Sequence, residues 1–158
     1  MRFDELAKHD ELVLKALYEA GWKPGRKCTE WAASQKTELE RRGFEVYPEV
    51  VDILEEFGNL TIGKVDSGLE TATTFINVDP SEALKDAELF LEYRDDANTI
   101  LCPLAAVCDR HYLGLNEDGH VFYIGLWIWH VGDNFDEALD ALIIGKKCPE
   151  VNEDGSWL

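Results

Sequence analysis

Four residues near the middle of the chain have side chains that bind metal ions or act as nucleophiles: Cys102, Cys108, Asp109 and His111. Structural zinc sites place paired cysteines about two to four residues apart. Five residues separate Cys102 from Cys108, and no second pair follows. Cys108 equally fits a small buried apolar position. The spacing therefore predicts no metal site. A small hydrolase or metal-dependent enzyme that uses Cys102, Cys108 and His111 is an alternative that metal bound to the purified protein would support.

Other catalytic signatures are missing from the sequence. The histidines, His9, His111, His120 and His130, share no H-E-x-x-H spacing, and we expect His130 at a strand end. There is no G-x-S-x-G elbow, no cysteine in a recognisable catalytic context and no G-x4-G-K-[ST] phosphate loop. We therefore expect no enzymatic activity and no cofactor.

The chain is strongly acidic, with 32 Asp and Glu against 15 Lys and Arg, a net charge of −17. Such a field repels nucleic acid and anionic membranes, and it speeds encounter with a basic partner. An acidic surface also keeps a cytosolic protein soluble, so charge alone does not decide between these roles. No apolar run reaches the ~18–20 residues of a membrane span, and the polar N-terminus lacks a signal-peptide core. We expect a cytoplasmic protein with reduced cysteines.

Two features of the sequence predict a protein-binding surface. Glu82 and Asp86 are four residues apart on a predicted helix, as are Glu88 and Glu92, and these four carboxylates would form an acidic ridge. Trp127 and Trp129 alternate on a predicted strand and would share one face. A solvated helix face and core packing are the simpler explanations. The residues we expect to bind a partner are Glu88, Glu92, Asp95, Asp96, Trp127 and Trp129.

The elements that position these residues centre on a predicted antiparallel meander over Tyr112–Val131. Two β-prone runs flank the turn Asn116–Gly119, where Gly119 can adopt a positive φ, and Gly125 is expected to be a bulge or bend. From Leu126 to Val131 both alternating faces are largely apolar, which is typical of a strand covered on both sides.

Helix signals surround the meander. We expect three helices before the first strand. The first covers residues 4–20 and is ended by Gly21, the second covers residues 29–42 with Thr29 as its N-cap, and the third covers residues 49–57 after Pro48. Asp79 caps a helix running to about Tyr93, and Asn134 opens a helix closed by Gly145. Short strands are expected at 60–62 and 73–78, and loops at 64–72 and 94–98. Residues 100–104 are expected to be an edge strand or a strand-entry segment, because Pro103 cannot donate a hydrogen bond. This order predicts a single α+β domain with an antiparallel or mixed sheet.

Short motifs follow one another along residues 15 to 145. The first half contains Ala20-Gly21-Trp22-x-Pro24-Gly25-Arg26, a helix centred on Trp31, Gly43-Phe44 before the Pro48 helix, and Glu55-x-Phe57-Gly58-Asn59-Leu60. The second half contains the Asp79-Pro80 helix start, Leu101-x-Pro103-Leu104, Asn116-x-x-Gly119-x-Val121-Phe122, and Gly132 before Phe135-x-Glu137-Ala138-Leu139. As an ordered set, these motifs resemble those of the third SUKH (Smi1/Knr4-like) immunity-protein family.

The resemblance implies an α+β domain, which we place at residues 1–145. The residues that follow Gly145, 146–158, are expected to be a loosely held tail. It also implies a bacterial protein without enzymatic activity that neutralises a toxin domain, commonly a nuclease or deaminase, encoded beside it. A basic toxin would be its partner, with no nucleic acid or membrane, and its oligomeric state is left open. The alternative is an adaptor that binds host proteins, as eukaryotic relatives do.

Two positions differ from the family pattern. The family usually has paired glycines at Gly58-Asn59, and Asn is the next best residue for a positive φ. It has Pro-Ile-Gly at Pro103-Leu104-Ala105, a change that bears on the local strand geometry.

Overall fold

The structure, a computed structural model, describes residues 11–63, 75–97, 100–108, 110–125, 127–152 and 156–157, and only the backbone of residues 94–97. Within these residues one six-stranded sheet has the order β1-β2-β3-β4-β5-β6. Every neighbouring pair is antiparallel, which confirms an α+β fold with an antiparallel sheet. The strands are β1 (Thr61–Gly63), β2 (Phe75–Asn77), β3 (Cys102–Val107), β4 (His111–Leu115), β5 (Val121–Ile124) and β6 (Ile128–Gly132).

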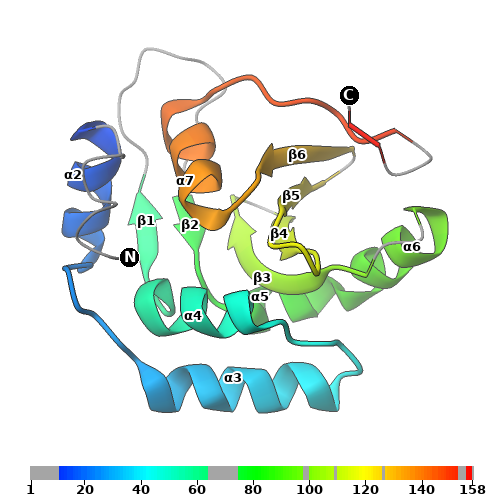
Figure 1. Cartoon of the computed structure of the whole chain (residues 1–158), viewed down its shortest axis with the longest axis horizontal. Coiled ribbons are helices and arrows are strands. Elements are labelled where there is room, and N and C mark those ends of the chain that lie inside the picture. Colours follow the sequence, from blue (N-terminus) through cyan, green and yellow to red (C-terminus); the bar gives the residue numbers. More distant parts are fainter. Residues whose placement is uncertain are drawn as a thin grey trace.

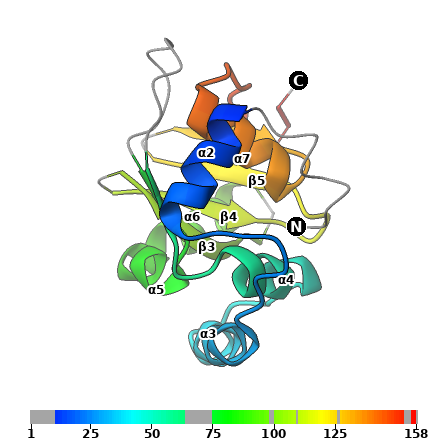
Figure 2. The same cartoon turned by 90° about the vertical axis from the view of Figure 1, so that its left-hand side faces the viewer.

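Helices lie on both sides of this sheet (Figures 1 and 2). The views show α4 and α7 on one side and α5 on the other. α7 packs against β6 and α2, α2 against β1, and α5 against β3. Trp22, Phe90 and Phe122 are the largest fully buried side chains of the core between these layers. The described helices are α2 (Glu11–Ala20), α3 (Thr29–Arg41), α4 (Pro48–Phe57), α5 (Pro80–Ala83), the 3₁₀ turn η1 (Leu84–Asp86), α6 (Ala87–Ala97) and α7 (Phe135–Ile144).

Most predicted helix boundaries are confirmed by their capping interactions. The side chains of Asp79 and Asn134 accept hydrogen bonds from the backbone N–H groups of Ser81 and Glu137. Gly145 ends α7 with a φ of 91°, as expected for a C-terminal glycine. Thr29 is not the N-cap of α3: it is the first helical residue, and the cap position is Cys28, which makes no side-chain cap hydrogen bond.

The helix expected from residue 80 to about Tyr93 is interrupted by η1, and its last part, α6, runs on to Ala97. A 3₁₀ turn advances roughly 120° per residue instead of roughly 100°, which brings Leu84 and Phe90 closer to one side. Both side chains are buried. Over residues 94–97 the expected loop was wrong, because polar residues alone do not end a helix and neither Gly nor Pro occurs there.

Pro103 is the second residue of β3, which is an interior strand, so of the two expectations the strand-entry segment is confirmed and the edge strand is wrong. β3 pairs with both β2 and β4, but only Ala106 and Val107 pair with the short β2. Pro103 therefore lies beyond the end of β2, and the register against β4 shifts between Pro103 and Ala105. An interior proline is tolerated at such an irregularity. The irregularity falls where the chain departs from the family's Pro-Ile-Gly.

The meander forms as predicted, with two corrections. β6 begins at Ile128, after a turn in which the Gly125 N–H donates to the Trp127 carbonyl at 3.0 Å. Trp127 therefore lies outside the strand and does not share a face with Trp129 by alternation. His130 lies in the middle of β6, paired with Phe122, and not at its end.

The C-terminal segment is held against β6, in contrast to the expected loose tail. The backbone N–H of Val151 donates to the Ile128 carbonyl at 2.7 Å, and that of His130 donates to the Pro149 carbonyl at 3.0 Å. Trp129 and Glu150 form an isolated antiparallel bridge. Predictions for residues 4–10, 64–74, 98–99, Asp109 and Leu126 lie outside the described residues. None of the described helices combines the length and apolar character that crossing a membrane requires.

Candidate functional site

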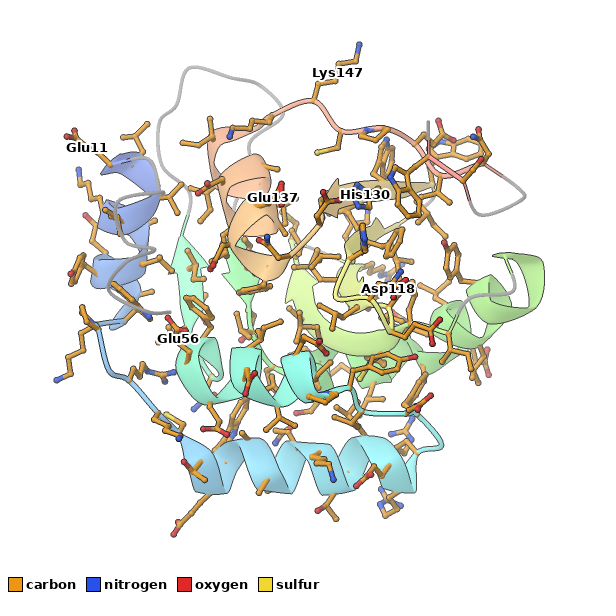
Figure 3. The ribbon with its side chains drawn as sticks, viewed as in Figure 1. Glu11, Glu56, Asp118, His130, Glu137 and Lys147 are labelled. Atoms are coloured by element: carbon orange, nitrogen blue, oxygen red, sulfur yellow. The ribbon has the colours of Figure 1, made fainter. Side chains whose placement is uncertain are left out.

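A cleft of about 240 Å³ lies between α4, the β4–β5 turn and the start of α7. Its described lining contains six carboxylates and no Lys or Arg: Glu49, Asp52, Glu56, Asp118, Asp133 and Asp136. We call it the acidic cleft. Figure 3 shows Glu56 at one end of α4 and Asp118 toward the other, with Lys147 pointing away beyond α7.

Apolar side chains from α4 and α7 also line the acidic cleft. Ile53 and Phe57 come from α4, and Phe135 comes from the first turn of α7. The ring centroids of Phe57 and Phe135 lie 5.1 Å apart, and the ring of Trp22 stacks on Phe57 with its centroid 6.5 Å away. This packing fixes the spacing of the two helices. The cleft therefore combines an apolar lining with negative charge.

α4 supplies three of the carboxylates from one face. Glu49, Asp52 and Glu56 follow the i, i+3, i+7 spacing that places residues on one helical stripe. Trp22 Nε1 donates to Glu56 Oε2 at 3.0 Å. The end of the helix is held by Arg26, whose guanidinium donates to the carbonyls of Glu56 and Gly58 at 2.7 and 2.8 Å.

The β4–β5 turn positions Asp118 and His120. Asn116 is buried, and its side-chain oxygen accepts from the N–H groups of Asp118 and His120 at 3.0 and 2.9 Å. Gly119 has a φ of 86°, which confirms the positive φ expected there. The turn is therefore closed by its own hydrogen bonds.

Asp133 and Asp136 lie at the N-terminus of α7. Asn134 Oδ1 accepts from the Glu137 N–H at 2.8 Å, which starts the helix between the two carboxylates. The partial positive charge of a helix N-terminus favours anions, typically by about 0.3–1 kcal/mol each. This partly offsets the mutual repulsion of the carboxylates at this end of the cleft.

Asp133 also contacts two histidines beside the cleft. His120 Nδ1 and His130 Nε2 are 2.8 Å apart, and Asp133 Oδ1 lies 3.2 and 3.3 Å from these two nitrogens. The ring of Trp157 stacks on His130 at 4.4 Å with an interplanar angle of 1°. Burial and the neighbouring His120 ring lower the pKa of His130, against a smaller raising effect of Asp133.

Only part of the predicted acidic ridge is open to a partner. Glu88 and Glu92 are exposed on α6. Glu82 pairs with Lys85 at 2.7 Å, and Asp86 accepts a hydrogen bond from the Tyr112 hydroxyl. Asp95 and Asp96 lie in the last turns of α6, where the structure describes only the backbone.

The predicted tryptophans lie away from α6. Tyr93 of α6 packs against Phe122, which pairs with His130, whereas Trp129 pairs with Tyr123. Because neighbouring strand residues point to opposite faces, Trp129 and α6 lie on opposite faces of the sheet. Trp129 packs edge-on against Tyr123 at 5.7 Å, and Trp127 is 57% exposed. The structure thus separates the two halves of the predicted surface.

The alternative metal set, Cys102, Cys108 and His111, does not assemble. Cys102 begins β3 and Cys108 follows its end, so roughly 20 Å of strand separates them. Burial raises the pKa of the Cys102 thiol to about 12, and His111 Nδ1 lies 2.6 Å from the Tyr123 hydroxyl. Among the described residues, the group of ligand-type side chains that converges is His120, His130 and Asp133.

The acidic cleft was not predicted from the sequence. Its residues come from α4, the β4–β5 turn and α7, and only the fold brings them together. One signal was present: Glu49, Asp52 and Glu56 form an acidic stripe that borders the apolar stripe of the same helix. The arrangement is suited to binding a positively charged group beside apolar surface.

Comparison with known proteins agrees with this fold. The family model of the SUKH-3 immunity proteins matches residues 9–145. The chain belongs to the SUKH-3 immunity protein family, which indicates a role in toxin immunity in a family that is generally non-enzymatic. Neither the search of curated proteins nor that of solved structures found a match.

Proposed function

We propose that this protein neutralises a basic cognate toxin domain, such as a nuclease or deaminase, by binding it stoichiometrically through the acidic cleft. The observation that supports the proposal most strongly is the cleft lining, in which six carboxylates and no described Lys or Arg surround Ile53, Phe57 and Phe135. Family membership supplies the class of partner.

An Arg or Lys side chain of the toxin suits the cleft as its occupant. Both residues have an apolar stem that can lie against aromatic rings and a cationic head that pairs with carboxylates. A nuclease carries such side chains on the face that binds its anionic substrate. Occupying them would block the substrate, so inhibition would require no chemistry from the immunity protein.

The net charge of −17 supports the same partner. Complementary charge accelerates the encounter of two proteins and disfavours wrong partners. A competing toxin-binding surface is the one predicted from the sequence, which consists of Glu88, Glu92, Asp95, Asp96, Trp127 and Trp129. Matched charge reversals in the cleft and on α6 distinguish the two surfaces.

The test is co-expression with the C-terminal toxin domain encoded by the adjacent gene, with cell survival and co-purification measured. We expect survival and a 1:1 complex with the wild-type protein, and loss of both with a folded Glu49→Lys/Asp52→Lys variant. Cell death and no complex with the wild-type protein would contradict the proposal for that toxin.

The adaptor role is the second candidate. If the adjacent gene encodes no toxin domain and the protein instead forms a complex with host proteins, the adaptor role replaces the immunity role.

A further inference from the structure

We propose that His120, His130 and Asp133 form a binding site for a divalent transition metal, with Zn²⁺ as the expected ion. The proposal does not rest on toxin binding, although Asp133 also lines the acidic cleft. It rests on three side chains, His120 just before β5, His130 within β6 and Asp133 directly after β6, whose ligand atoms all lie within 4.8 Å of one another.

The geometry matches one face of a coordination tetrahedron. The edges of the triangle formed by His120 Nδ1, His130 Nε2 and Asp133 Oδ1 are 2.8, 3.2 and 3.3 Å. Zinc bonds of about 2.0–2.1 Å at tetrahedral angles place ligand atoms about 3.3 Å apart. Two edges already have this length, and the third requires the two rings to separate by about 0.5 Å.

The chemistry of the three groups favours a cation between them. A single N–H between the rings satisfies the nitrogen–nitrogen edge, but it leaves the Asp133 oxygen facing a ring lone pair. A metal ion satisfies all three groups at once. Two imidazoles with one carboxylate favour Zn²⁺ and similar ions over Mg²⁺ or Ca²⁺, which prefer oxygen ligands.

The surroundings hold the ligands in place. The backbone N–H of His120 donates to Asn116 Oδ1 at 2.9 Å, and His130 lies within β6 beneath the stacked ring of Trp157. Asp133 has a side chain that is 64% exposed, so the fourth position faces solvent and would hold water.

The site is tested on the tag-free full-length protein by isothermal titration with ZnCl₂. We expect one Zn²⁺ per chain, a rise in melting temperature on binding, and at least about tenfold weaker affinity for Asp133→Asn and for His120→Asn. Asp118→Asn is the matched control, because it removes a nearby charge on the same turn as His120 but no ligand. We expect its affinity to stay within about twofold of wild type.

Asp133 is exposed, so Asp133→Asn should fold, and circular dichroism verifies this. Three results would overturn the site: no 1:1 zinc binding, unchanged affinity in Asp133→Asn, or an equal loss in Asp118→Asn. Binding of Mg²⁺ as tightly as Zn²⁺ would also overturn it, because the carboxylates of the acidic cleft would then be binding cations by non-specific electrostatic attraction.

Discussion

The indole of Trp129 packs edge-on against Tyr123, whereas the indole of Trp127 is 57% exposed in the turn before β6. Trp129→Ala should therefore lower the free energy of unfolding by about 1–3 kcal/mol through lost ring contacts and burial. Trp127→Ala should change it by less than about 0.5 kcal/mol. Urea denaturation of both variants measures the difference, and a larger loss for Trp127→Ala would contradict the assignment.

Because the pKa of His130 is lowered in the folded protein, we expect the protein to lose stability in mild acid. In the folded protein, burial and the neighbouring His120 ring lower this pKa from the ordinary histidine value of about 6.5. The unfolded state therefore binds the proton more readily, and the stabilisation present above about pH 6.5 is lost as pH falls through the folded pKa. The melting temperature in metal-free buffer should fall between pH 7.5 and pH 5, and less steeply in His130→Gln. Equal slopes would contradict this.

At the scale of elements, α3 and α4 meet where Trp31 lies over Gly58. A Cβ on Gly58 would collide with the Trp31 ring and the Leu54 carbonyl, although the φ of −58° is allowed for any residue. Gly58→Ala should therefore destabilise the protein by about 2–3 kcal/mol through overpacking. Gly63→Ala is the control, since nothing lies within 4 Å of its added Cβ. Thermal denaturation compares them, and equal stability of the two variants would contradict the packing described.

The elements that the sequence predicted well have local signals. Asn134 and Asp79 cap their helices, and Gly119 takes the positive φ of its turn, because these geometries depend on a few adjacent residues. Asn59 has a φ of 63°, the positive φ that we expected of an asparagine standing where the family pattern has its second glycine. The sequence left open whether Pro103 lies in an edge strand or at the entry of an interior strand, because the answer depends on β2, a distant segment.

The candidate site was harder to predict than the fold. The acidic cleft joins Glu56 to Asp118 and Asp133 across three elements, and the zinc ligands His120 and His130 come together only through the register of β5 and β6. Sequence spacing carries no signal for either pairing. Conversely, the predicted Glu88 and Trp129 lie on elements that the sheet separates.

At the scale of the whole molecule, the charge of −17 predicts how fast a basic toxin binds. The association rate should fall at least about tenfold between low salt and about 0.5 M salt, because screening shortens the range of the attraction. The dissociation rate should change less. Stopped-flow mixing measures both, and an association rate insensitive to salt would contradict the electrostatic part of the account.

The most direct test of the central claim is the affinity of the adjacent-gene toxin domain for two charge-reversed proteins, measured by isothermal titration. Glu49→Lys/Asp52→Lys alters the acidic cleft, and Glu88→Lys/Glu92→Lys alters α6 by the same net charge; all four side chains are exposed. Binding through the cleft predicts at least about a hundredfold loss for the first variant and less than about fivefold for the second. A large loss in the α6 variant alone would place the toxin on α6 and contradict the cleft.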